Sequence, residues 1–119
     1  MAEHNDLGKI GEELAVDYLQ QNGYQILETN FTAHKAEIDI IAKKKDWLIV
    51  VEVKTRSSID FGSPEDFVNK KKIKLLVKAI DEYVQQTGLD LEIRFDIIAI
   101  VRENGKFNIE HLEDAFYHF

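Results

Sequence analysis

The segment Trp47–Lys54 (WLIVVEVK) most constrains the fold, because it is an apolar stretch that ends in two charges. Apolar and β-branched residues over this length are typical of a buried β-strand. Side chains alternate between the two faces of a strand, so Glu52 and Lys54 point to the same side. Burying such charges is unfavourable unless they are paired or bound to a metal. The pattern predicts a sheet with a polar site at the end of a core strand.

Other strands are predicted around this segment from short apolar or alternating stretches. They are Tyr24–Leu27, Glu37–Ala42, Leu91–Val101 and Lys106–Ile109. The polar residues 43–46 form a short turn, so Glu37–Ala42 and Trp47–Lys54 are expected to pair antiparallel. The dipeptide Asn104-Gly105 predicts a second hairpin, between the last two strands.

A helix is predicted over residues 6–22, with Gly23 as its stop signal. Its apolar face is expected from the spacing of Leu7, Ile10, Leu14 and Tyr18. Small residues widen that face, namely Gly8, Gly11 and Ala15. They indicate that the helix packs closely against the sheet.

A second helix is predicted to open at Pro64, after a loop over Thr55–Ser63, and to end near Gly88 after about six turns. Its apolar stripe is expected to comprise Ile73, Leu76, Val77, Ile80 and Val84. A helix between strands 47–54 and 91–101 makes that pair a parallel crossover. The order α-β-β-β-α-β-β predicts an α/β fold, with a central mixed β-sheet flanked by helices, in a single domain over residues 1–119.

The net charge of −7 argues at first against a nucleic-acid partner, because phosphate contact usually needs a basic surface. The charge is unevenly spread, however. Residues 35–78 hold eleven basic and seven acidic side chains, whereas the rest of the chain holds four basic and fifteen acidic ones. The absence of cysteine, of a secretory signal and of an apolar run long enough to span a bilayer predicts a cytoplasmic protein with no membrane partner.

Asp39 places another carboxylate inside a strand, between Ile38 and Ile40. Two neighbouring carboxylates repel each other, and a divalent cation relieves that repulsion. Carboxylate oxygens favour a hard cation, so Asp39 and Glu52 are predicted to bind Mg²⁺ or Mn²⁺. Such a cation polarises a phosphate and activates water, and Lys54 would orient that water. From spacing alone, a buried Glu–Lys ion pair that ends the strand explains the pattern equally well.

Six short stretches occur in a fixed order along the chain. They are G-x-x-G-E-x-x-A at Gly8–Ala15, E-I-D-I-I at Glu37–Ile41, V-E-V-K-T-R at Val51–Arg56, F-G-S-P at Phe61–Pro64, R-F-D at Arg94–Asp96 and A-F at Ala115-Phe116. On these stretches the chain resembles the YraN-like family of small bacterial proteins, in the PD-(D/E)XK restriction-endonuclease-like superfamily. The resemblance implies a central four-stranded mixed sheet flanked by helices. It also implies a metal-dependent nuclease, with branched or otherwise structured DNA as the expected substrate.

The resemblance further implies which residues act. The active site is expected to comprise Asp39, Glu52 and Lys54, with the backbone carbonyl of Val53 as an additional metal ligand. Resolvase-like members of the superfamily make Glu12 a candidate fourth acidic group. An exposed helix carboxylate is the alternative interpretation of Glu12.

Four residues near this site are candidate contacts to nucleic-acid phosphates: Lys72, Lys70, Arg56 and Thr55. The first two lie at the flanks of the apolar stripe of the second helix, and the other two follow Lys54. The remaining lysines of that helix, Lys71, Lys74 and Lys78, are expected to lie on a solvated face.

Two other functions stay open at this stage. One is a nucleic-acid-binding module that keeps the fold without turnover. The other is an acidic partner protein that contacts a basic subunit, which the net charge of −7 favours. Because junction-cutting relatives in the superfamily work as dimers, the resemblance also raises the expectation of a homodimer.

Overall fold

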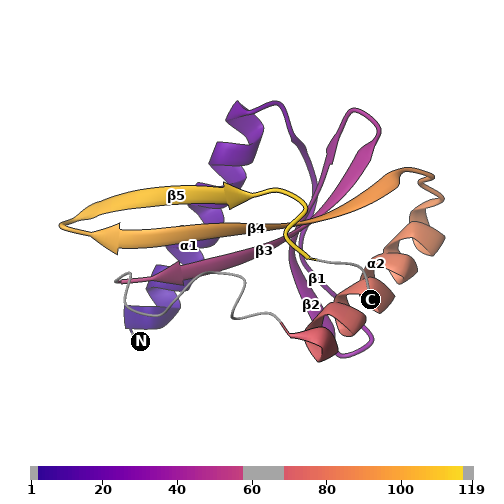
Figure 1. Ribbon diagram of the computed structural model, residues 1–119, viewed down its shortest axis with the longest axis horizontal. Coiled ribbons are helices and arrows are strands. Elements are labelled where there is room, and N and C mark those ends of the chain that lie inside the picture. Colours follow the sequence, from indigo (N-terminus) through magenta and orange to yellow (C-terminus); the bar gives the residue numbers. More distant parts are fainter. Residues whose placement is uncertain (1–2, 58–68, 117–119) are drawn as a thin grey trace.

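The computed structural model describes residues 3–57 and 69–116, with side chains from residue 7 onwards. The elements are α1 (Glu3–Gln21), β1 (Gln25–Ala33), β2 (Ala36–Lys44), β3 (Trp47–Arg56), α2 (Lys70–Thr87), β4 (Glu92–Glu103) and β5 (Lys106–Leu112) (Figure 1). The strands form one sheet in the order β1-β2-β3-β4-β5. β3 and β4 run parallel, and the other neighbouring pairs are antiparallel.

The predicted α/β class and element order are confirmed, and the architecture is consistent with a restriction-endonuclease-like fold. The sheet has five strands, however, and not the four that the resemblance implied. The edge strands β1 and β5 extend well beyond the predicted ranges 24–27 and 106–109. Their additional residues are mostly polar and exposed, so they carry little of the apolar alternation that marks a strand in a sequence.

The segment between β3 and α2 differs from the prediction at both ends. Thr55 and Arg56 belong to β3 and pair with β4, so they are not loop residues. At the other end, Asn69 has an extended backbone, and its side chain accepts a hydrogen bond of 2.9 Å from the Lys72 N–H. Asn69 is thus an N-cap, and α2 does not continue a helix opened earlier in the chain. Pro64 and residues 58–63 of the predicted loop lie outside the described residues.

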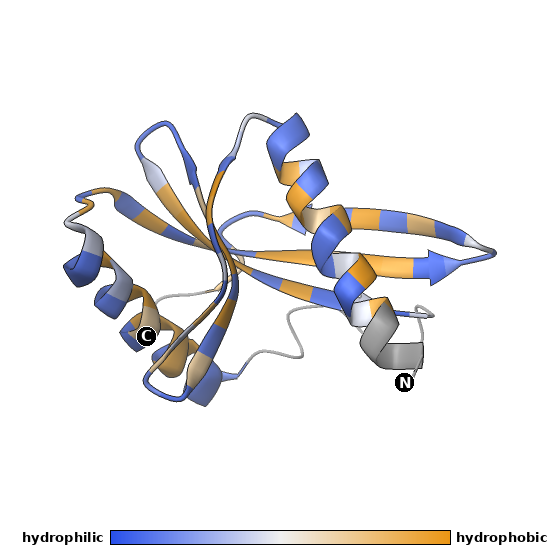
Figure 2. Ribbon diagram, turned by 180° about the vertical axis from the view of Figure 1, so that it is seen from behind, coloured by the Kyte–Doolittle hydropathy of each residue, from blue (hydrophilic) through white to orange (hydrophobic). Residues whose placement is uncertain are grey.

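The two helices cover opposite faces of the sheet (Figure 1). The cluster on the α1 face contains Ala15, Leu19, Ile40, Ile49, Val51, Ile98 and Ile100. The cluster on the α2 face contains Ile41, Leu48, Val50, Leu76, Ile80 and Ile97. Figure 2 shows the hydrophobic residues concentrated along the strands between the helices. Successive residues of β3 alternate between the two clusters, which places Glu52 and Lys54 on the α2 face.

Each helix presents a slightly different face from the predicted one. Ile10 of α1 is 39% exposed and Val77 of α2 is 45% exposed, although both were expected in the apolar stripes. In α1 the contact with β3 passes through Gly11, where an added Cβ would lie 1.9 Å from the Oγ1 of Thr55. Absence of a side chain at Gly11 therefore sets how closely α1 approaches the sheet. Neither of the described helices is long and apolar enough to cross a membrane.

Candidate active site

The candidate site lies where β2 and β3 separate. Backbone pairing between these strands ends at Ile40 and Val51. Beyond that point β2 remains paired with β1, and β3 with β4. The Oδ2 atom of Asp39 accepts a hydrogen bond of 2.8 Å from the Val53 N–H, which has left the β2–β3 ladder. The fork between the strands thus fixes Asp39 next to Glu52.

Glu52 is held by two lysines from different elements. Its side chain is only 5% exposed, and its Oε2 lies 3.4 Å from the Nζ of Lys54 on the same strand. The Nζ of Lys72, on the first turn of α2, forms a second ion pair with the same oxygen. A buried carboxylate needs compensation, and these two ammonium groups supply it. Lys72 also ties α2 to the charged end of β3.

Asp39, by contrast, lies among other carboxylates. Its pKa is raised from 3.8 to about 7, chiefly because burial removes water from the carboxylate and also because Glu52 repels its charge. The hydrogen bond from the Val53 N–H acts in the opposite direction, and Glu12 and Glu37 add further repulsion. The ionised site therefore holds negative charge that is only partly balanced.

This imbalance predicts a pH-dependent gain in stability for Asp39→Asn. The folded-state pKa lies above the unfolded value, so the stabilisation from protonated Asp39 is complete below pH 4 and is lost as pH rises through 7. Without metal, the free energy of unfolding of the variant at pH 8 is expected to be about 2 kcal/mol higher than that of wild type. Each pKa unit is worth about 1.4 kcal/mol, and the expected gain is set below the full value because the site keeps some hydration.

Urea denaturation in EDTA at pH 4.5 and pH 8 measures this difference. The gain should shrink at the lower pH, where the carboxyl is neutral in the folded wild type. Asp17→Asn on the exposed side of α1 is the matched control, and it should show no pH-dependent gain. A difference between Asp39→Asn and wild type that is the same at both pH values would contradict the raised pKa.

A cavity of about 420 Å³ opens over Asp39 and Glu52. Its remaining lining comes from the β1–β2 turn, the start of β2 and the first turns of α2: Lys35, Ala36, Glu37, Asn69, Lys71, Lys72, Leu75 and Leu76. The lining therefore combines carboxylates with lysines. Such an arrangement suits a ligand that carries negative charge and can also share a cation with carboxylates.

The other predicted residues lie at different distances from this centre. Glu12 is near enough to repel Asp39, and its Oε1 accepts a hydrogen bond of 3.2 Å from the Asn30 side chain. Thr55 packs against Gly11 on the α1 face, away from the face that carries Glu52. Arg56 is partly exposed at the end of β3, and Lys70 is exposed at the start of α2. The structure thus brings together Asp39, Glu52, Lys54 and Lys72 of the predicted set.

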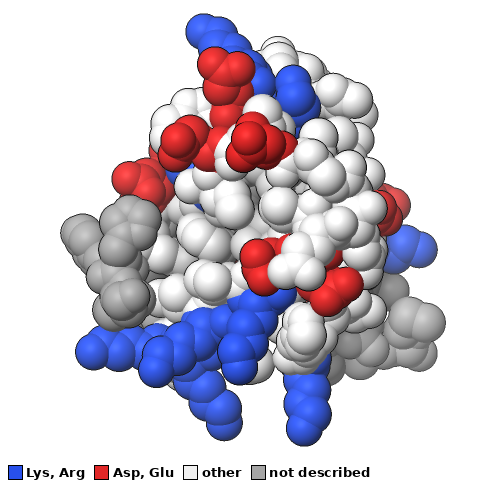
Figure 3. Space-filling model, turned by 90° about the vertical axis from the view of Figure 1, so that its right-hand side faces the viewer, with Lys and Arg blue, Asp and Glu red and all other residues white. Residues whose placement is uncertain are grey.

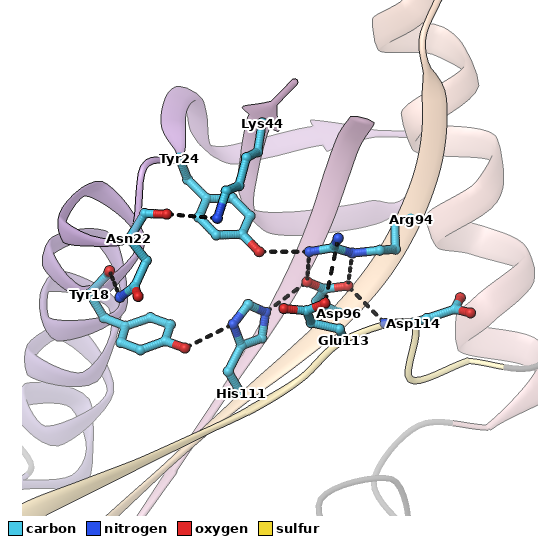
Figure 4. Close-up of polar contacts among 9 residues, drawn as sticks. All are labelled: Tyr18, Asn22, Tyr24, Lys44, Arg94, Asp96, His111, Glu113 and Asp114. Atoms are coloured by element: carbon cyan, nitrogen blue, oxygen red, sulfur yellow. Dashed lines mark hydrogen bonds and ion pairs between the residues drawn. The ribbon is translucent and has the colours of Figure 1, made fainter. Parts of the chain in front are cut away.

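A second buried polar cluster lies on the α1 side of the sheet and is centred on Asp96 (Figure 4). The Asp96 carboxylate is fully buried and accepts hydrogen bonds of 2.9 and 2.8 Å from Arg94. It also forms a hydrogen bond of 2.7 Å with the Nε2 of His111 and accepts one of 3.0 Å from the Asp114 N–H. Burial alone would raise the pKa of Asp96, but these donors together lower it below its usual range. Asp96 therefore remains ionised.

Two tyrosines complete this cluster. The Tyr24 hydroxyl lies 2.7 Å from the Nη2 of Arg94, and the Tyr18 hydroxyl lies 3.0 Å from the Nδ1 of His111. The carboxylate of Asp96 faces the Nε2 of His111, and the Nδ1 of the same ring faces the Tyr18 hydroxyl, so both ring nitrogens have a hydrogen-bond partner. The cluster joins α1, β4 and β5 with its polar groups satisfied, so it functions as a structural clamp. The R-F-D stretch drew attention to Arg94 and Asp96 in the sequence, whereas no pattern there singled out the tyrosines or His111.

Comparison with known proteins supports the resemblance found in the sequence. The chain matches the model of the family described as "Uncharacterised protein family UPF0102" over residues 11–100. It is 70% identical over 119 residues to a UPF0102 protein from Flavobacterium psychrophilum, and the match covers both chains completely. The chain belongs to the UPF0102 family. This is the YraN family, so that prediction is confirmed.

Other UPF0102 proteins are similar over nearly their whole length. One from Flavobacterium johnsoniae is 56% identical over 123 residues, with all of both chains covered. One from Bacteroides thetaiotaomicron is 49% identical over 117 residues, which covers 98% of this chain and 97% of the relative. These matches therefore span the segments that build the fork and the cavity in this chain.

The cavity also includes residues that the sequence did not single out, Lys35 and Asn69 among them. Lys35 lies in the β1–β2 turn with a φ of 65°, and the turn brings it beside the start of α2. Asn69 could have been found as an N-cap, because it directly precedes the periodic residues of α2. Lys35 offered no such signal, since the length of β1 was underestimated and the turn was therefore not predicted.

Proposed function

We propose that this protein is a metal-dependent nuclease that hydrolyses phosphodiester bonds of DNA. One observation carries the proposal: Asp39 and Glu52 lie together at the strand fork and line a cavity that lysines also line. Carboxylates bind the cation that such a reaction uses, and lysines bind the phosphates. Branched or structured DNA is the proposed substrate class, and a homodimer that makes paired cuts is the proposed assembly.

The donor set fits a hard divalent cation. Two carboxylates supply anionic oxygens, and a bound cation would offset the burial and the repulsion from Glu52 that raise the pKa of Asp39. The carbonyl of Val53 is the proposed third ligand. No cluster of three or more acidic, His or Cys side chains suited to a metal occurs within the described residues. Mg²⁺ tolerates such a sparse set, because it commonly keeps several waters and takes phosphate oxygens as ligands.

The protein's own groups have distinct roles in this proposal. When bound, Mg²⁺ or Mn²⁺ supplies a Lewis acid next to the scissile phosphate. Lys54, 29% exposed and 3.4 Å from Glu52, is placed to orient the attacking water and to offset charge that develops on the phosphate. Lys72 reaches the same carboxylate from α2 and can exchange that contact for a phosphate oxygen. Glu52 therefore positions both cationic side chains.

A cleavage assay on labelled nucleic acids tests the proposal. Purified protein with Mg²⁺ or Mn²⁺ is expected to cut at least one of duplex, flap, four-way junction and single-stranded DNA, and EDTA should stop the reaction. RNA substrates of matched shape establish whether DNA is preferred. Complete absence of cleavage across the panel, from protein shown to be folded, would overturn the nuclease assignment.

A nucleic-acid-binding module without turnover is the second candidate. The sparse set of metal-binding side chains among the described residues favours it, as do the two lysines that already neutralise Glu52. This candidate predicts salt-sensitive binding that needs no divalent cation and that Glu52→Gln leaves intact. Cleavage that depends on both Glu52 and Mg²⁺ would exclude it.

A further inference from the structure

The first half of α2 carries an unusual concentration of positive charge. Lysines occupy five of the nine positions from residue 70 to residue 78, with no acidic residue among them. The first turn also lacks acidic residues, although the N-terminus of a helix favours negative charge. Lysines three or four residues apart repel each other on a helix surface. The isolated helix would be more stable without this pattern, so the lysines point to an anionic ligand.

Three of these lysines lie on one exposed face. Lys71, Lys74 and Lys78 are spaced by three and four residues and surround Leu75, where they line a hollow of about 340 Å³. No ion pair of these three is found with the described residues. Lys71 and Leu75 also line the cavity above Asp39 and Glu52. The two hollows therefore adjoin each other at Lys71 and Leu75, and we refer to the pair as the α2 groove.

The molecular surface supports this placement. On the face shown in Figure 3, the largest group of basic side chains lies at the lower end, where α2 begins in Figure 1, with acidic side chains above it and a smaller basic group at the upper end. The protein is acidic overall, so this end is a local exception. A polyanion that approaches the molecule is directed to this groove and away from the acidic surface.

We propose that the phosphate backbone of one nucleic-acid strand lies along α2, with its phosphates on Lys71, Lys74 and Lys78 and its scissile bond over Asp39 and Glu52. This inference rests on the proposed function and adds the path of the substrate. Seven residues of helix span about 10 Å. Successive phosphates of one strand rise by about 3.4 Å along the axis of a duplex, so this length matches roughly three phosphates.

The lining favours phosphate over the carboxylates of an acidic protein. Arginine is the side chain that pairs with carboxylates through two parallel hydrogen bonds, and no arginine lines either described hollow. Lysine acts as a point charge and suits the repeated, sequence-independent charge of a nucleic-acid backbone. The groove is therefore predicted to bind nucleic acid with little sequence preference.

Fluorescence anisotropy with a labelled 20-nucleotide strand and the corresponding duplex tests the groove. The parent protein is Asp39→Asn in EDTA, so binding is measured without cleavage. The triple variant Lys71→Gln, Lys74→Gln and Lys78→Gln is compared with a control triple variant, Lys9→Gln, Lys45→Gln and Lys106→Gln. Both lose three positive charges, and the control lysines are exposed on α1, the β2–β3 turn and β5. Thermal melting confirms that both variants are folded.

The groove variant is expected to bind at least about 10-fold more weakly at 100 mM salt. Its slope of log affinity against log salt should fall by about two to three, because each lost phosphate contact removes roughly 0.7 to 0.9 of slope. The control should stay within about 2-fold of the parent. Equal losses in the two variants, or no binding by the parent, would overturn the proposal. So would competition by polyglutamate as effective as that by oligonucleotide at equal charge.

Failure of this inference is distinguishable from failure of the nuclease assignment. If the groove variant binds normally but wild-type protein cleaves DNA, the site stands and the substrate takes another path. If the groove variant loses binding but wild type cuts nothing, the path along α2 stands and the protein is a binding module.

Discussion

Glu52→Gln is expected to reduce phosphodiester cleavage by on the order of 10³-fold while nucleic-acid affinity stays equal or rises. The substitution removes one of only two carboxylates at the fork and also releases Lys54 and Lys72 from their shared partner. A loss of 10³-fold is about 4 kcal/mol of transition-state stabilisation, in the range expected when a metal ligand is removed. Affinity is retained because the variant repels phosphate less than wild type does.

Single-turnover cleavage and anisotropy on the same substrate separate these two effects. Glu110→Gln, an exposed residue of β5, is the matched control and should leave both quantities within about 2-fold of wild type. Lys54→Met should lower cleavage by on the order of 10²-fold, as for other groups that assist proton transfer. Cleavage at the wild-type rate by Glu52→Gln would mean that the observed nuclease is a contaminant or that another site acts.

Asp96→Ala is expected to lower the free energy of unfolding by about 3–5 kcal/mol, because it leaves a largely buried arginine without its partner. The Arg94 side chain is only 14% exposed, and its pKa is raised mainly by its hydrogen bonds to Asp96. His111 and the Asp114 N–H lose the same acceptor. Because native domains are stable by only about 5–15 kcal/mol, this loss is a large fraction of the stability. Chemical denaturation followed by circular dichroism measures it.

A graded series distinguishes the clamp from unspecific damage to the fold. His111→Phe keeps a ring between Tyr18 and Tyr24 but removes two hydrogen bonds, so it should cost about 1–2 kcal/mol. Asp17→Ala on the exposed side of α1 should cost less than about 0.5 kcal/mol. A change below 1 kcal/mol for Asp96→Ala would show that the cluster is not a clamp.

The central strands and the candidate catalytic residues were predictable because strong local rules agreed there. In Trp47–Lys54 the apolar run marked β3, and the two charges at its end broke that pattern on one face. The parallel pairing of β3 with β4 followed from the helix between them. Asp39 stood out for the same reason as Glu52, as a charge between apolar strand residues. The fork between β2 and β3 was not predicted, because strand separation depends on tertiary packing.

Features that depend on tertiary packing were not predicted from the sequence. Thr55 looked like a loop residue after Lys54, but its contact with Gly11 places it in a strand under α1. Ile10 and Val77 had the right spacing for core positions, yet the close approach of α1 through its small residues left Ile10 exposed. The lysine face of α2 was expected to be a simple solvated surface. Its position next to the cavity over Asp39 is the observation that points to a ligand.

The most direct measurement of the central claim is calorimetric titration of Mg²⁺, repeated with Mn²⁺, into wild type and Asp39→Asn at pH 8. Wild type is expected to show one saturable site. Asp39→Asn should show none, because one of the two carboxylates is gone although its amide can still accept from the Val53 N–H. Asp17→Asn should bind like wild type. Absence of a site in wild type, or equal binding by Asp39→Asn, would contradict a metal-dependent active site at this fork.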